Sequence, residues 1–209
     1  MSTALPTPEL AESVARCSFA PVNGSASRSN YRTIVADPPW PVRQPPSKWK
    51  VGTVNAPLPY NSMTLGEIAA LPVASLAEES CHLYVWTVNR FVRDTYDVVE
   101  AWGFTPAMLL TWCKTPMGIG PGRQYASTTE FCLFAWRGPQ EREPKRIERN
   151  WWNWPRGGHS AKPEAFQDIV ESVSPGAYIE LFARRKRLGW HAWGNEVPCD
   201  VELVTQNNK

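Results

Sequence analysis

The most constraining stretch of this chain is Asp37-Pro38-Pro39-Trp40, which directly follows the apolar segment 31–36. Two consecutive prolines fix φ and lack backbone N–H groups, so a strand over 31–36 must end here. The carboxylate of Asp37 and the carbonyl of Pro38 can accept hydrogen bonds from an exocyclic amino group, and the indole of Trp40 can stack on a base. Because the same residues also fit an ordinary strand-ending turn, the motif alone leaves both interpretations open.

Composition narrows the class of protein. With 209 residues, 43% of them hydrophobic, the chain can bury a core of its own. Its net charge of +2 does not by itself indicate a nucleic-acid binder, so any electrostatic contact must be local. The five cysteines are scattered without a Cys-x-x-Cys pair, which argues against a disulfide framework or a zinc site and indicates free thiols. No apolar run approaches the roughly 18 to 20 residues that a membrane span needs, and no signal-peptide pattern is present, so we expect a cytoplasmic protein.

Local patterns predict one α/β domain. We expect a disordered leader at 1–29, a single domain at 30–204 and a short tail at 205–209. Strands alternate with helices, which indicates a doubly wound, buried parallel sheet whose ligands bind beyond the carboxyl ends of the strands. The predicted strands cover 31–36, 82–88, 106–113, 130–136 and 178–183.

Three helices and two long loops complete this prediction. Thr64 and Glu67 match a capping box, so a helix is expected from Thr64 to about Leu71. Asn89 is expected to cap a second helix that continues to about Trp102, and the third covers 163–173. Loops are expected at 41–59, where prolines are frequent, and at 137–162.

The segment 137–162 combines cations with tryptophans. Its basic residues surround Trp151, Trp152 and Trp154, a texture typical of surfaces that contact phosphates and bases. Glutamates dilute the charge, and tryptophans also pack into cores, so a structural role is the alternative.

An ordered series of segments resembles the MT-A70 family of S-adenosylmethionine-dependent adenine N6-methyltransferases over residues 31–197. A single four-residue motif is weak support, whereas an ordered series is strong support. The resemblance implies a Rossmann-like methyltransferase sheet, permuted so that the catalytic motif precedes the main cofactor-binding strand. The matching segments are 37–40, 60–63, 83–89, 103–104, 112–114, 129–134, 137–138, 159–164, 179–185, 189–190 and 193–196.

The resemblance also implies roles for individual residues. Asp37, Pro38, Pro39 and Trp40 would be the catalytic residues. Glu180 would accept from ribose hydroxyls, and Lys162 would contact the methionine carboxylate or the ribose. The remaining cofactor-binding residues would be Arg184, Asn195 and Glu196, with Asp37 and Pro38 at the same site. The substrate-binding residues would be Tyr60, Asn61, Met63, Lys114, Trp151, Trp152 and Trp154.

Methyl transfer to adenine requires activation of the acceptor nitrogen. The adenine amino nitrogen is a poor nucleophile because its lone pair is delocalised into the ring. Hydrogen bonds to the Asp37 carboxylate and the Pro38 carbonyl would favour a pyramidal nitrogen and stabilise its developing charge, while Trp40 and Tyr60 flank the base. No metal is needed, and the three histidines match no metal-site spacing.

We therefore expect methyl transfer to adenine N6 in DNA. DNA is favoured because a chain of this length has little room for appended RNA-binding domains, and adenine in RNA is the alternative. Cytosine N4 is disfavoured because relatives acting on cytosine usually carry Ser in place of Asp37. A silent nucleic-acid-binding subunit is a further alternative, although such subunits lose the acid or the second proline. Because family members often work in pairs, we expect a homodimer.

Overall fold

The computed structural model describes residues 30–42, 62–115, 124–139, 146–158 and 161–203. The expected leader and tail lie outside these residues, as do Tyr60 and Asn61. The described chain contains seven strands and several short helices. In order they are β1 (Tyr31–Ala36), α1 (Leu65–Ala69), η1 (Val73–Ser75), β2 (Ala77–Thr87), η2 (Asn89–Phe91), α2 (Val92–Ala101), β3 (Thr105–Thr115), β4 (Thr129–Arg137), β5 (Trp151–Pro155), α3 (Glu164–Val173), β6 (Tyr178–Leu181) and β7 (Trp190–Trp193).

All seven strands belong to one mixed sheet with the order β5-β3-β4-β2-β1-β6-β7. β1 pairs in parallel with β2 and β6, β6 with β7, and β3 with β5. β4 runs antiparallel to both of its neighbours. The expected parallel pairing is found except at β4. The described residues between β3 and β4 form no helix, and a parallel pair would need a crossover.

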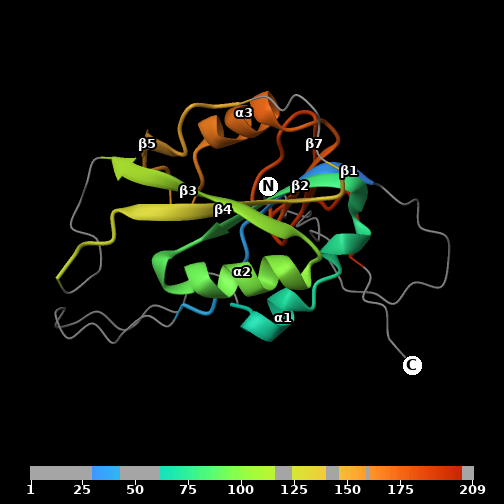
Figure 1. Cartoon of the computed structure of the whole chain (residues 1–209), viewed down its shortest axis with the longest axis horizontal. Helices are drawn as coiled ribbons and strands as arrows, with labels where there is room; N and C mark the ends of the chain where they lie inside the picture. The colour runs from blue at the N-terminus through green and yellow to red at the C-terminus, as the bar shows by residue number, and fades with distance from the viewer. Residues whose placement is uncertain (1–29, 43–61, 116–123, 140–145, 159–160, 204–209) are drawn as a thin grey trace, which may run out of the picture.

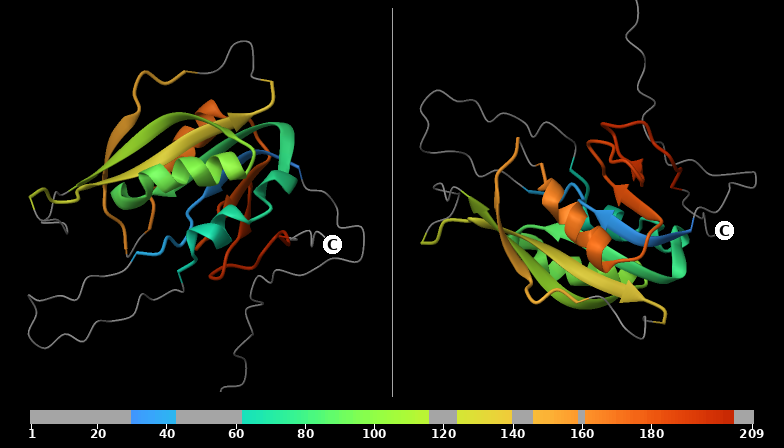
Figure 2. Two further views of the ribbon diagram at one scale, coloured as in Figure 1. Left: turned by 60° about the horizontal axis from the view of Figure 1, so that its bottom comes forward. Right: turned by 90° about the horizontal axis from the view of Figure 1, so that it is seen from above.

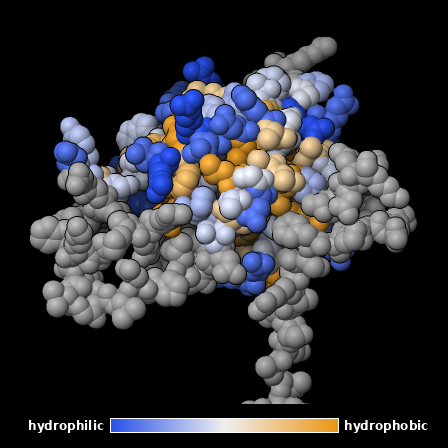
Figure 3. All heavy atoms as spheres, turned by 90° about the horizontal axis from the view of Figure 1, so that it is seen from below, coloured by the Kyte–Doolittle hydropathy of each residue, from blue (hydrophilic) through white to orange (hydrophobic). Residues whose placement is uncertain are grey.

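Helices cover both faces of the sheet, as a doubly wound α/β fold requires (Figures 1 and 2). α1 and α2 pack on one face, where Ile68, Val99 and Trp102 join the larger apolar core. α3 covers the other face, where Phe166 and Val170 join a second, mostly aromatic cluster. Seen from below, the face of α1 and α2 shows hydrophobic side chains among hydrophilic ones (Figure 3). The architecture is the predicted Rossmann-like methyltransferase fold.

The sheet register brings distant residues to one edge. Ala36 pairs with Leu181, so Asp37 follows β1 at the point where β6 ends. Glu130 stands near the start of β4 and pairs with Trp112 near the end of β3. Because β4 is reversed, its first residues lie at the same edge as the carboxyl ends of its neighbours. This edge carries the residues considered below.

Local predictions had mixed outcomes. The capping box is confirmed, since the Thr64 hydroxyl accepts from the Glu67 backbone and the Glu67 carboxylate accepts from the Thr64 backbone. Asn89 does not cap α2, because a 3₁₀ turn intervenes and Phe91 takes the N-cap position. The stretch 137–162 is not wholly a loop, since its tryptophan-rich part forms β5 at the sheet edge.

Two further findings concern cysteines and membrane spans. Cys81, Cys113 and Cys132 are free thiols, but Cys199 is disulfide-bonded, so the prediction that the cysteines are free thiols is wrong for Cys199. Among the described helices, none has the length and apolar character needed to cross a membrane.

A close backbone approach yields the first prediction. A Cβ on Gly194 would lie 2.2 Å from the carbonyl oxygen of Ala183 and 2.6 Å from its nitrogen. We expect Gly194→Ala to lower the free energy of unfolding by about 1–3 kcal/mol, measured by urea denaturation, because backbone atoms must move. Gly66→Ala is the matched control, since no atom lies within 4 Å of its Cβ position and α1 gains helix propensity. Equal stability of the two variants would contradict this packing.

Candidate functional site

An ion pair joins the motif after β1 to the segment before α3. The ammonium of Lys162 lies 2.6 Å from Oδ2 of Asp37 and 3.5 Å from Oε2 of Glu130. It also lies 5.4 Å from the centroid of the Trp86 ring, within cation–π range. Asp37 and Lys162 are 125 positions apart in the chain and were predicted to share a site, and the structure brings them together.

The charge on Lys162 is stabilised by its surroundings. Burial alone would lower the pKa of Lys162, but the carboxylates of Asp37 and Glu130 and their hydrogen bonds outweigh it. The net pKa lies above the ordinary value. Lys162 is therefore a cation at neutral pH and acts as a fixed counter-charge for Asp37.

The backbone after Asp37 is held by short hydrogen bonds. The carbonyl of Pro38 accepts from the Trp40 N–H at 2.8 Å, and the carbonyl of Pro39 accepts from the Met63 N–H at 2.9 Å. Together with the fixed φ of both prolines, these bonds give the turn a single geometry. Met63 was predicted to bind substrate, but here it is half-buried against the core and secures this turn through its backbone.

Trp40 is part of the core. Its side chain is 5% exposed, its ring stacks on Phe91 with centroids 5.6 Å apart, and its Nε1 donates to the Trp86 carbonyl at 2.9 Å. This geometry does not fit the prediction that Trp40 stacks on a substrate base, because both the ring face and the donor are already used. Trp40 instead anchors the turn after β1 to the end of β2.

A cavity of about 230 Å³ opens beside Asp37. It lies where β1 and β6 end and α3 begins, the usual ligand position in sheets of this class. Glu180 near the end of β6 contributes a carboxylate, which accepts from Nε2 of Gln167 at 2.7 Å. The lining residues are Val35, Asp37, Trp86, Ala161, Lys162, Pro163, Phe166, Gln167, Glu180, Phe182, Arg184 and Arg185.

The pKa of Glu180 is raised above its ordinary value. Burial, with a further contribution from the nearby Asp37 carboxylate, raises the pKa of Glu180 to about 7. Arg185, the hydrogen bond from Gln167 and the charge of Lys162 oppose this rise but do not cancel it. A buried carboxyl that is ready to ionise is suited to accept from hydroxyl groups of a ligand.

The other predicted cofactor residues divide into two groups. Arg184 lines the cavity, and its Nε lies 3.6 Å from the Glu196 carboxylate. Asn195 and Glu196 are exposed and do not line the cavity. The structure thus brings Asp37, Lys162, Glu180 and Arg184 together, and Glu196 is connected to them only through Arg184.

Phe182 is a lining residue that sequence reasoning missed. It follows β6 directly and has φ of 62°, in the left-handed region that costs a non-glycine residue about 1–3 kcal/mol. Its ring meets Trp193 edge to face, with centroids 5.3 Å apart. This conformation ends β6 at Leu181, two residues before the predicted end, and turns the chain around the cavity.

Glu130 was also missed. Its segment, 129–134, is one of those that resemble the family, but the sequence assigned no role to Glu130. One of its carboxylate oxygens bonds Lys114 and the other lies near Lys162, so it joins two predicted site residues. A charged residue at the start of an otherwise apolar strand was the signal that could have identified it.

The three tryptophans of β5 do not form one surface. Trp152 is buried and stacks on Trp154, with centroids 5.4 Å apart, and Trp154 packs against the cluster beneath α3. Trp151 is 50% exposed, because alternate residues of a strand point to opposite faces. The core interpretation therefore fits Trp152 and Trp154, and only Trp151 presents a large surface to solvent.

The described residues contain no group of three or more histidine, cysteine or acidic side chains placed to hold a metal ion. The functional groups of the site are carboxylates, an ammonium, a guanidinium and backbone carbonyls.

A mixed α/β sheet of this order, with its ionisable residues gathered at one edge, is the architecture of a Rossmann-like methyltransferase. Sequence comparison identifies the protein family. A profile of the MT-A70 family matches residues 31–196, and the chain belongs to this family.

Similar proteins come from bacteria and eukaryotes. The type II methyltransferase M.MunI of a Mycoplasma species is 32% identical over 197 residues, covering 86% of this chain and 83% of that protein. The N(6)-adenine-specific methyltransferase METTL4 of Mus musculus is 26% identical, over 80% of this chain and 37% of its own length. The N6-methyladenosine RNA methyltransferase MTA1 of Cryphonectria parasitica is 29% identical, over 80% of this chain and 52% of its own length.

Substitution of Trp40 distinguishes a role in anchoring the turn to the core from a role in stacking on a substrate base. Trp40→Ala removes a buried indole and should lower the free energy of unfolding by about 3–5 kcal/mol in urea denaturation. Trp40→Phe retains most of the ring contact and should cost less, since chiefly the hydrogen bond to Trp86 is lost. A Trp40→Ala protein as stable as the wild type would support the platform interpretation instead.

Glu180 makes stability depend on pH. Its pKa is about 7 in the folded protein and near its ordinary value of 4.5 in the unfolded chain. Across this interval the folded state holds a proton that the unfolded state has released, so the free energy of unfolding falls as pH rises. Urea denaturation of the wild type and of Glu180→Gln between about pH 5 and pH 8 measures this. The wild type should lose stability relative to the variant up to about pH 7, and a constant difference would refute the assignment.

Proposed function

We propose that this protein transfers the methyl group of S-adenosylmethionine to the N6 amino group of adenine in DNA. The observation that carries the proposal is the Asp37 carboxylate, fixed by Lys162 beside a cavity that contains Glu180. An acceptor for the amino group and an acceptor for ribose hydroxyls thus stand at neighbouring strand ends. This arrangement suits a reaction between a nucleotide-like cofactor and an exocyclic amine.

Asp37 is prepared for this role by its ion pair. Lys162 occupies Oδ2, and Oδ1 makes no hydrogen bond with the described residues, so it is available to the amino group. The Pro38 carbonyl already accepts from Trp40 and keeps a second lone pair. Two preorganised acceptors would orient the nitrogen lone pair and stabilise the positive charge that develops on the nitrogen.

The residues around the first cavity fit S-adenosylmethionine. Glu180 can accept from ribose hydroxyls, and the carboxylates of Asp37 and Glu180 suit a cationic ligand. Arg184 and Arg185 offer guanidinium groups at the same cavity. When bound, the cofactor supplies an activated methyl group, so no metal or covalent nucleophile of the protein is required.

The choice of DNA rests on the relatives. The matched region spans most of M.MunI but about half of the RNA methyltransferase MTA1. Adenine in RNA is the second candidate, because MTA1 and this chain share the matched region. Matched DNA and RNA pools, incubated with labelled cofactor and followed by identification of the methylated base, separate the two.

Asp37→Asn tests the catalytic role. The change keeps the shape of the side chain but removes its charge, and kcat should fall at least about 100-fold. Fold and cofactor binding should persist, as measured by circular dichroism and calorimetry. Asp97→Asn, on the exposed side of α2, is the control and should be fully active. Substantial turnover by Asp37→Asn would reject the role, and a wild type that binds nucleic acid without methyl transfer would indicate a silent subunit.

The homodimer expected from the family resemblance is tested separately. Size-exclusion chromatography with light scattering at working concentration should give twice the chain mass. An active monomer would contradict the expectation without affecting the assignment of the site.

A further inference from the structure

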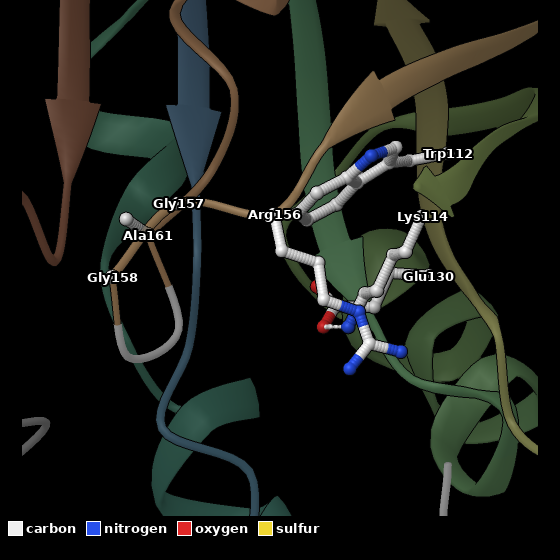
Figure 4. A pocket seen from close by; sticks show the side chains of 7 residues that line it. All are labelled: Trp112, Lys114, Glu130, Arg156, Gly157, Gly158 and Ala161. Atoms are coloured by element: carbon white, nitrogen blue, oxygen red, sulfur yellow. Dashed lines mark hydrogen bonds and ion pairs between the residues drawn. The ribbon is translucent and has the colours of Figure 1, made fainter. Parts of the chain in front are cut away.

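A second cavity has a volume of about 430 Å³, and Figure 4 shows the residues that line it. Ala161 lines both cavities, and Lys162 follows it in the chain. The side chains of this second cavity come from β3, β4 and the segment after β5. Its lining residues are Trp112, Lys114, Glu130, Arg156, Gly157, Gly158 and Ala161.

The aromatic wall of this cavity is not free for stacking. The Lys114 ammonium lies 5.1 Å from the centroid of the Trp112 ring, and the ring is only 4% exposed. The Trp112 Nε1 already donates to the Trp154 carbonyl at 2.9 Å. A base could stack on Trp112 only by displacing Lys114, so the cavity suits a polar occupant better than a base.

The polar groups favour an anion. Lys114 is bonded to Glu130, whereas the Arg156 guanidinium has no hydrogen bond or ion pair with the described part of the chain. Figure 4 shows the Arg156 side chain extending toward the Lys114–Glu130 pair. The backbone N–H groups of Gly157 and Gly158 donate to no group in that part either. Guanidinium and backbone N–H groups that have no partner among the described residues are typical ligands of phosphate.

We propose that Arg156, with the Gly157 and Gly158 backbone, binds a phosphate of the substrate strand next to the target adenine. This inference rests on the proposed function and adds how the strand is held. Two cations face one carboxylate in the lining, so a phosphodiester charge would be neutralised there. The enzyme would then recognise adenine as part of a strand rather than as a free base or nucleoside.

The position of the anion site relative to the reaction centre supports this use. Glu130 bonds Lys114 in the second cavity and lies 3.5 Å from Lys162, which bonds Asp37. An alternating row of charges thus connects the proposed phosphate site to the proposed amino-group acceptor. A phosphate bound at one end of this row would fix the register of the strand at the other end.

Charge removal at Arg156 is the first test. Methyl transfer from labelled cofactor to a single-adenine oligonucleotide is measured across a salt series for the wild type, Arg156→Gln and Arg156→Lys. Arg156→Gln should raise KM about tenfold at low salt with kcat nearly unchanged, and should reduce the salt slope by about 1. Arg156→Lys should retain most of the slope, and Arg93→Gln on α2 should behave like the wild type. Unchanged KM and slope in Arg156→Gln would overturn the proposal.

A neutral backbone linkage identifies the phosphate. Methylphosphonate placed on either side of the target adenine, one linkage at a time, should weaken wild-type binding at one position only. The same substitution should have no further effect in Arg156→Gln, because the contact is already lost. Equal losses in both proteins would reject Arg156 as the ligand. Competition by free inorganic phosphate, if it depends on Arg156, shows that the site also accepts the free ion.

A measurement of oligonucleotide binding tests the role of Arg156 independently of catalysis. Fluorescence anisotropy of the same oligonucleotides reports on Arg156 whether or not a methyl group is transferred. A wild type that methylates neither DNA nor RNA would refute the proposed function. A wild type that is active but binds the methylphosphonate oligonucleotides as tightly as the unmodified ones would refute only the anion site.

Discussion

The site depends on one interaction, the contact of the Lys162 ammonium with the carboxylates of Asp37 and Glu130. It draws together the turn after β1, the start of β4 and the segment before α3, which are far apart in the chain. Each carboxylate is largely buried, and the ammonium offsets the cost of placing its charge there. With Lys162 between them, one oxygen of Asp37 is held and the other remains open. Removal of Lys162 would leave both carboxylates without this shared cation.

Rigidity of the turn comes from the core rather than from the site itself. The indole of Trp40 is packed and hydrogen-bonded, and the carbonyl of Pro39 is tied to the start of the segment that enters α1. Asp37 therefore stands on well-packed structure, as the proposed preorganised acceptor requires. The strained backbone of Phe182 fits the same pattern, because the packing of its ring against Trp193 supports the conformation.

Much of this could be predicted from sequence, and the failures have physical causes. Apolar runs located the central strands, and the family resemblance placed Asp37, Lys162 and Glu180 together. The same resemblance could not show that Trp40 faces the core, because an aromatic residue beside a reactive acid suits either role. The direction of β4 was missed because apolar runs carry no information about strand polarity. Glu130 was missed for the same reason, since its position at the active edge depends on that reversal.

The reversal of β4 has a consequence for how such a protein can diversify. Lys114 near the end of β3 and Glu130 near the start of β4 bond each other across the antiparallel pair, so the two strands are held together at this edge. The positions of both side chains therefore depend on the strand pairing and on this bond. Other positions on β3 and β4 can change in sequence while Lys114 and Glu130 keep their places beside Lys162.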